Sequence, residues 1–108
     1  MRVSGWSTLS VDIDRNATHS HARLTGELDM VTAGQLHDVL DGLRRDGFHR
    51  VDLDVSGLEF LGAAGLSVLL RADAQFRAVG GRVTLTQPTA LVRRVLAITG
   101  LDTQLIIE

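Results

Sequence analysis

Residues 51–66 read VDLDVSGLEFLGAAGL, and this stretch contains the pattern that decides the fold. Val51, Leu53 and Val55 alternate with polar residues, which is typical of a β-strand with one apolar face. A glycine-rich turn follows, and residues 62–79 are then expected to form a helix. The apolar side chains expected on its buried side are Leu66, Leu69, Leu70 and Phe76. A strand that leads through such a turn into a helix indicates an α/β protein.

The change from alternating apolar residues, typical of a strand, to helical spacing recurs on both sides of this segment. The other elements expected are strands at residues 9–13, 21–28, 82–86 and 105–107, a polar turn at 16–20, a helix at 32–45, and a helix opened by Pro88 and ended by Gly100. The buried stripe of this last helix is predicted to be Leu91, Val92, Val95 and Leu96. Two strands followed by repeated helix–strand pairs predict a mixed, mostly parallel sheet with an N-terminal antiparallel hairpin and three main helices.

Length and composition indicate one domain, residues 1–108, with its core at about residues 8–108. The chain is 44% hydrophobic and 22% charged, with a net charge of −2. Its basic residues are scattered and its aromatic residues are few, which does not fit a nucleic-acid-binding surface. No apolar run reaches the roughly 18 residues of a membrane span, and residues 1–8 do not resemble a signal peptide. We expect a cytoplasmic protein that does not insert into membranes.

A search for catalytic or metal-binding residues finds no complete set. There is no cysteine, and the four histidines are His19, His21, His37 and His49. His19 and His21 would share a strand face, but no third ligand follows at a recognisable spacing. The alternating aspartates are interpreted as the solvated side of half-buried strands; they are Asp12, Asp14, Asp52 and Asp54. We expect no enzyme activity, no metal and no cofactor.

Three segments in this order and spacing resemble the STAS domain of bacterial anti-sigma factor antagonists. They are LTGELD at 24–29, the segment at 51–66, and GGRVTL at 80–85, followed by residues 91–101. The resemblance runs from about residue 8 to residue 108 and implies a single-domain STAS-like fold. It also implies that the chain binds an anti-sigma factor of the kinase type and thereby releases a sigma factor. In that family the kinase inactivates the antagonist by phosphorylating a serine at the start of the second helix.

The resemblance places the family's phosphoserine at Ala63, where this chain has no hydroxyl group. Gly62 and Ala64 stand where the family has an aspartate and a second hydroxyl residue. A phosphoserine would add about −1.5 to −2 charges to a contact surface, so this chain lacks the family's switch at that position. Ser56 and Ser67 do not match the family's site. The missing aspartate at position 62 also removes a helix cap worth about 1 kcal/mol.

The predicted partner-binding surface has two parts. The resemblance implies that the family's acidic residue after the second strand is retained here as Asp29, and the second part is the altered turn before the second helix. The residues of this surface are Asp29, Met30, Leu61, Gly62, Ala63, Ala64 and Gly65. A competing interpretation is that the turn only packs under a neighbouring loop. The sequence also fits a STAS accessory subunit on the ATPase of a lipid-transport ABC system, or a nucleotide or small-ligand sensor whose anion is held at the helix start. It allows a homodimer without indicating one.

Overall fold

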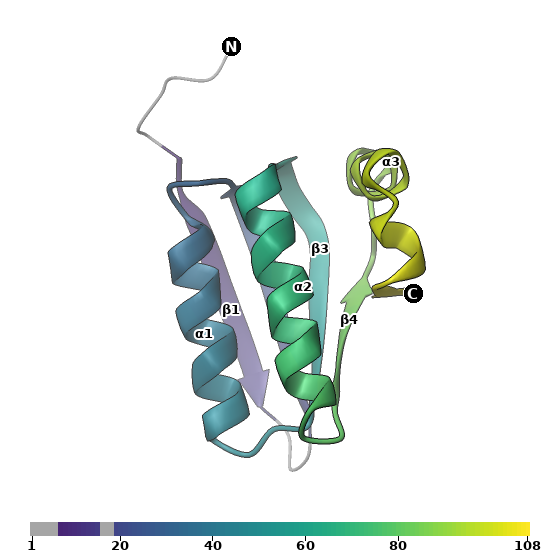
Figure 1. The fold of residues 1–108 in the computed structure, drawn as a ribbon. Helices are drawn as coiled ribbons and strands as arrows, with labels where there is room; N and C mark the ends of the chain where they lie inside the picture. Colours follow the sequence, from purple (N-terminus) through teal and green to yellow (C-terminus); the bar gives the residue numbers. More distant parts are fainter. Residues whose placement is uncertain (1–6, 16–18) are drawn as a thin grey trace.

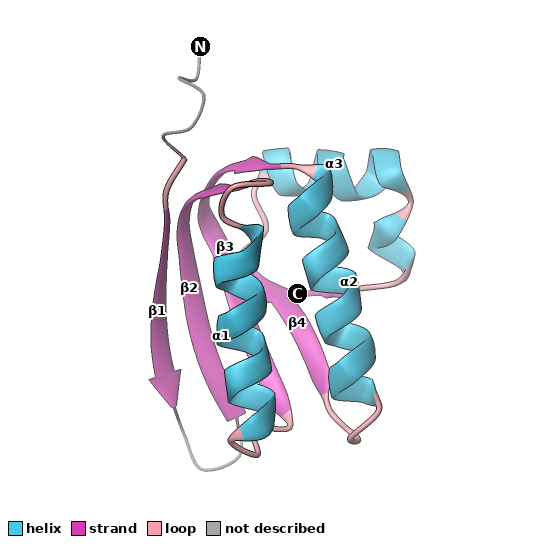
Figure 2. Ribbon diagram, turned by 60° about the vertical axis from the view of Figure 1, so that its left-hand side comes forward, coloured by secondary structure: helices cyan, strands magenta, loops and turns pink. Residues whose placement is uncertain are grey.

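The structure, a computed structural model, describes residues 7–15 and 19–108. It consists of a sheet and three α-helices (Figures 1 and 2). In chain order the elements are β1 (Leu9–Arg15), β2 (His19–Leu28), α1 (Ala33–Arg45), β3 (Arg50–Leu61), α2 (Ala63–Arg77), β4 (Arg82–Thr86), α3 (Ala90–Thr99), a 3-10 turn η1 (Leu101–Thr103) and β5 (Ile106–Ile107). The predicted order of strands and helices is confirmed, and η1 is the element that the sequence pattern did not predict.

The strands form one mixed sheet in the order β1-β2-β3-β4-β5. β1 pairs with β2 in an antiparallel hairpin, and the remaining neighbours are parallel, as predicted. Because parallel strands end at the same side of a sheet, the segments that follow β2, β3 and β4 meet there. We call this side the carboxyl edge; it comprises residues 29–32, 60–64 and 87–90, together with α3, which follows the last of them.

Helices α1 and α2 lie side by side on one face of the sheet, and α3 runs crosswise to them at the carboxyl edge (Figures 1 and 2). The core between helices and sheet is made of aliphatic side chains and one phenylalanine. Among those with at most 1% exposure are Leu24, Leu36, Leu40, Leu53, Leu69 and Phe76. The helical and strand periodicities therefore place these residues in one shared interior, as the pattern predicted.

Two strand predictions need correction. The polar turn expected at residues 16–20 is wrong for His19 and Ser20, which already pair with Arg50 and Val51 in the parallel β2–β3 ladder; residues 16–18 lie outside the described residues. The strand expected at 51–55 continues to Leu61 because β2 pairs with β3 along almost its full length. Pairing with a neighbour, and not local alternation, sets these strand ends.

The start of α3 also differs from the prediction. Pro88 precedes the helix and does not open it; Thr89 is the N-cap, and its hydroxyl oxygen accepts a hydrogen bond from the Val92 amide at 3.3 Å. Leu91, predicted to be buried, is 38% exposed, whereas Val92 is fully buried. The helix is therefore turned so that its buried stripe begins one residue later than expected.

Candidate functional site

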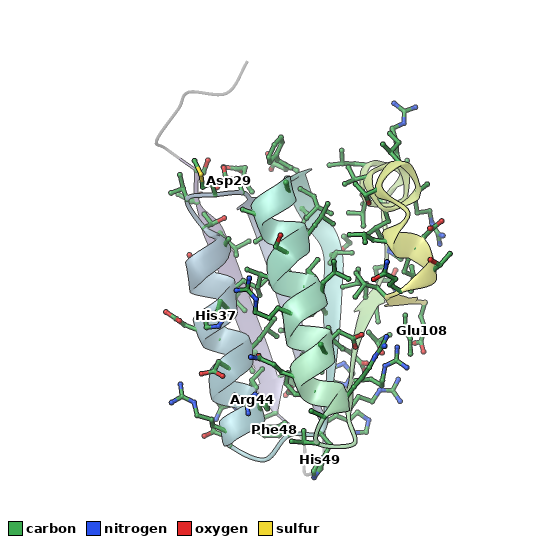
Figure 3. The ribbon with its side chains drawn as sticks, in the orientation of Figure 1. Asp29, His37, Arg44, Phe48, His49 and Glu108 are labelled. Atoms are coloured by element: carbon green, nitrogen blue, oxygen red, sulfur yellow. The ribbon has the colours of Figure 1, made fainter. Side chains whose placement is uncertain are left out.

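The β3–α2 turn lies beside the loop that follows β2. The Gly62 amide donates a hydrogen bond to the Leu28 carbonyl oxygen at 2.9 Å. A Cβ atom at position 62 would lie 3.9 Å from the Cα atom of Asp29. Asp29 and the start of α2 are far apart in the sequence, and the structure brings them together at the carboxyl edge (Figure 3). The two halves of the predicted partner-binding surface are thus adjacent.

The predicted residues differ in exposure. Met30 is 85% exposed, and Ala63 is also exposed. Asp29, Gly62 and Ala64 are half-buried, while Leu61 is 5% exposed and Gly65 is buried. The part of this surface that another protein can reach therefore centres on Met30 and Ala63. Leu61 and Gly65 lie beneath this surface and support it.

Gly65 allows the start of α2 to approach β2 closely. A Cβ atom at position 65 would lie 2.5 Å from Leu28 Cγ and 3.1 Å from the Leu28 carbonyl oxygen. Leu28 is fully buried, so its side chain has no free space into which it could move. The absence of a side chain at position 65 is therefore a packing requirement.

The start of α2 has no side-chain cap, and its first turn carries no acidic residue. Gly62 is the N-cap, with φ −105° and ψ 177°, and makes no side-chain capping hydrogen bond. No acidic residue lies in the first turn of α2 either. The predicted loss of the cap is confirmed. What remains at the surface of this turn is mainly the methyl groups of Ala63 and Ala64.

Asp29 holds the loop that presents Met30. Its Oδ1 atom accepts hydrogen bonds from the amides of Val31, at 2.9 Å, and Thr32, at 3.2 Å. Its Oδ2 atom accepts one from the Ser7 hydroxyl. The Ser7 bond is the main cause that lowers the pKa of Asp29; burial opposes it, and the bonds from Thr32 and Val31 add to the lowering. Asp29 thus has a structural role at the start of α1, whether or not a partner touches it.

Exposed apolar side chains gather at the carboxyl edge, and sequence reasoning missed most of them. Of the seven large apolar side chains that are exposed in the described residues, five lie there. They are Met30, Val31, Phe60, Leu91 and Ile98. Only Met30 was predicted; Phe60 could have been found as an apolar residue next to the turn. Large apolar patches on the surface of soluble proteins often mark interaction sites.

The sheet face opposite α1 and α2 carries a ladder of charges. Asp52 pairs with His21 at 3.5 Å and with Arg50 at 3.2 Å, and Asp54 pairs with Arg23 at 3.3 Å. Asp52 is only 8% exposed. Its interpretation as a solvated side chain is therefore wrong, because the longer side chains of neighbouring residues cover it.

A shallow cavity of about 410 Å³ lies on this charged face. Its lining includes Asp12, Asp14, Asp52 and Asp54 with His21 and Arg23. His19 and His21 do share a face, with ring centroids 5.9 Å apart. Within residues 7–15 and 19–108, however, no three potential ligands are grouped to hold a metal ion. In the same residues, no helix has the length and apolar character needed to cross a membrane.

Sequence comparison links almost the whole sheet and its helices to one family. A family profile described as "Mlab, STAS domain" matches residues 11–108. The putative anti-sigma factor antagonist BtrV of Bordetella bronchiseptica is 35% identical over 79 residues, which are 73% of this chain and 68% of BtrV.

Solved structures show the same fold. An anti-sigma factor antagonist from Mycobacterium paratuberculosis superposes with a TM-score of 0.82 at 26% identity, over 93% of this chain and 85% of that chain. Unphosphorylated SpoIIAA, another anti-sigma factor antagonist, superposes with a TM-score of 0.78 at 22% identity, over 92% of this chain and 88% of that chain. The chain belongs to the STAS domain family, and anti-sigma factor antagonists are among the relatives that share its sequence and fold.

Proposed function

We propose that this chain is a regulator of the anti-sigma factor antagonist type. It docks through its carboxyl edge onto an anti-sigma factor of the kinase type and thereby releases a sigma factor in the cytoplasm. The similarity to BtrV supports this function. The structural observation that carries the proposal is the exposure of Met30, at 85%, beside the methyl-lined turn at Ala63. The role is one of binding and not of catalysis.

The apolar character of the edge favours a protein partner. Removing the exposed side chains of Met30, Val31 and Phe60 from water would stabilise a complex, at roughly 25 cal/mol per Å² of apolar surface. Small residues at the α2 start let a partner backbone approach closely. A few central apolar side chains often supply most of the free energy of binding in such contacts.

We propose that docking is not controlled by phosphorylation at the α2 start. Ala63 occupies the position of the family's phosphoserine and has no oxygen to accept a phosphoryl group. Ser67 lies within α2, one turn further from the edge. Without that added charge, the surface stays competent to bind.

The proposal is tested by isothermal titration calorimetry, in which the full chain is titrated into purified anti-sigma factors of the kinase type. The variant Met30→Asp is expected to weaken binding by tenfold or more, because it places a charge in the apolar contact. The control is Val79→Asp, which changes another exposed apolar side chain, just beyond the far end of α2. The proposal fails if no such factor binds, or if the two variants weaken binding equally.

A second candidate function keeps the fold and changes the partner. Here the chain is a STAS accessory subunit on the ATPase of a lipid-transport ABC system. The observation that favours it is the matching family profile, whose description is "Mlab". Co-purification with an ABC ATPase, with no binding to any kinase-type anti-sigma factor, would select this second function.

A further inference from the structure

Helix α3 has a second side that faces away from the core and combines two apolar residues with an arginine. Val92 and Leu96 are fully buried and fix the inner side of the helix. Leu91, Arg94 and Ile98 follow at i, i+3 and i+7, so they lie together on another side. Leu91 is 38% exposed and Ile98 is 78% exposed. We call these three residues the outer stripe of α3.

The charge of α3 is entirely positive. Its sequence ALVRRVLAIT contains two arginines and no acidic residue. In the described part of the chain neither arginine forms an ion pair. Most other arginines pair with a carboxylate; they are Arg15, Arg23, Arg44, Arg45, Arg50, Arg77 and Arg82. Arg93 and Arg94 are therefore available to bind an acidic group on another molecule.

We infer that the outer stripe of α3 is a second contact area for the protein partner, and that the partner's surface there is acidic around an apolar centre. This inference rests on the proposed function, because α3 lies at the same carboxyl edge as the α2 start (Figures 1 and 2). A partner that covers Met30 and Ala63 and extends along this edge meets α3 next. Charge complementarity at such a surface gives specificity and faster association.

The surroundings of α3 favour an acidic protein over an anionic membrane. The main apolar face of α3, with Val92 and Leu96, is already used in the core, so the helix cannot bury that face in lipid. Asp29 lies at the same edge, and the exposed Glu59 directly precedes residues 60–64 of that edge in β3. The chain as a whole has a net charge of −2. An anionic bilayer would repel these groups, whereas a protein can place its acidic residues opposite α3 alone.

The first test needs no identified partner. The ¹⁵N-labelled full chain is titrated with a synthetic amphipathic peptide that has glutamates beside a leucine stripe, and with the same peptide carrying lysines. The glutamate peptide is expected to shift the amide signals of residues 91–98, and about 0.5 M salt should remove the effect because it screens charges beyond about 4 Å. Equal shifts with the lysine peptide, or none in α3, would overturn the inference.

A second measurement distinguishes a membrane from a protein. Vesicles of phosphatidylglycerol and phosphatidylcholine are sedimented with the wild-type chain and with Arg94→Glu. We expect both to remain in solution. If the wild-type chain sediments with the vesicles and Arg94→Glu does not, the outer stripe binds lipid and the inference is overturned.

The third measurement uses the anti-sigma factor that passes the docking test. Arg94→Glu and Ile98→Asp are each expected to weaken its binding about tenfold, and Arg71→Glu, an exposed charge reversal on α2, is the control. If these two variants bind like the wild type while Met30→Asp does not, the inference about α3 is wrong and the proposed function stands. If no factor binds the wild type, the proposed function fails, and the peptide titration decides the inference about α3.

Discussion

Gly65 lies so close to Leu28 that a Cβ atom at position 65 would sit 2.5 Å from Leu28 Cγ. This contact joins the start of α2 to the end of β2. Together with the hydrogen bond from the Gly62 amide to the Leu28 carbonyl oxygen, it keeps Ala63 next to the loop of Asp29 and Met30. The geometry of the proposed docking surface therefore depends on Gly65, which is itself buried.

Gly65→Ala is expected to destabilise the protein by about 1–3 kcal/mol, because the new methyl group overpacks a filled core position. Urea unfolding monitored by circular dichroism measures the change. Gly34→Ala is the matched control: it lies in α1 with no atom within 4 Å of the added Cβ. This control should be neutral or more stable by up to about 1 kcal/mol. Equal effects of the two variants would contradict the packing argument.

Gly62→Asp restores a cap to α2 and is expected to be about 1 kcal/mol more stable than Gly62→Ala. In both variants the added Cβ lies 3.0 Å from an atom of the Phe60 ring, which is partly exposed and can move, so this cost cancels. The difference arises from the carboxylate, which accepts hydrogen bonds from free amides and interacts favourably with the helix dipole. Thermal and urea unfolding of the pair measures it. Identical stabilities would show that the amides at the α2 start need no side-chain cap.

Asp29 is expected to make the stability of the protein depend on pH in the acid range. Its pKa is lowered from 3.8 in the folded state, mainly by the Ser7 hydroxyl. The resulting stabilisation is present above the unfolded value of 3.8 and is lost as the pH falls through the folded pKa. The difference in unfolding free energy between wild type and Asp29→Asn should therefore shrink between about pH 6 and about pH 2.

Ser7→Ala provides the control for this pH dependence. This variant removes the largest cause of the lowered pKa of Asp29. The difference in unfolding free energy between Ser7→Ala and Asp29→Asn should therefore change less with pH than the difference between wild type and Asp29→Asn. If Ser7→Ala has the pH profile of the wild type, the Ser7 hydroxyl is not the group that stabilises the Asp29 carboxylate.

Asp73→Ala is expected to destabilise the protein by about 2–4 kcal/mol. Asp73 is 3% exposed and accepts a hydrogen bond from the Val83 amide at 3.1 Å. It also pairs with Arg77 at 2.7 Å and Arg82 at 3.5 Å. Its loss therefore leaves the buried Val83 amide without an acceptor and removes both ion pairs. Urea unfolding measures the effect. The exposed Asp102→Ala should change stability by less than about 0.5 kcal/mol, and a similar effect of both variants would contradict a buried network.

Ala63→Ser is expected to restore phosphorylation. With ATP and a kinase-type anti-sigma factor, this variant should take up about one phosphate per chain, because the new hydroxyl is exposed at the first residue of α2. Intact-protein mass spectrometry measures the added mass. Ala64→Ser, one residue further, is the positional control and should stay unmodified. Phosphorylation of the wild-type chain, for instance at Ser67, would show that docking can be switched after all.

The sequence alone determined the order of the elements and the chemistry of the turn. Alternation in residues 51–55 and the helical stripes arise within a few residues of the chain, so they can be read before any long-range contact is known. The lack of a hydroxyl group at Ala63 is likewise a property of one residue. These features predicted the mixed sheet, the three helices and the uncapped start of α2.

The tertiary structure alone decided which residues meet and which stay exposed. Asp29 accepts a hydrogen bond from Ser7, which precedes β1, only because the fold brings these two distant segments together. Asp52 is covered by His21 from the neighbouring strand, and Leu91 faces outward because Val92 takes the buried position. Burial and pairing depend on groups far apart in the chain, and a pattern that repeats every two or four residues contains no information about them.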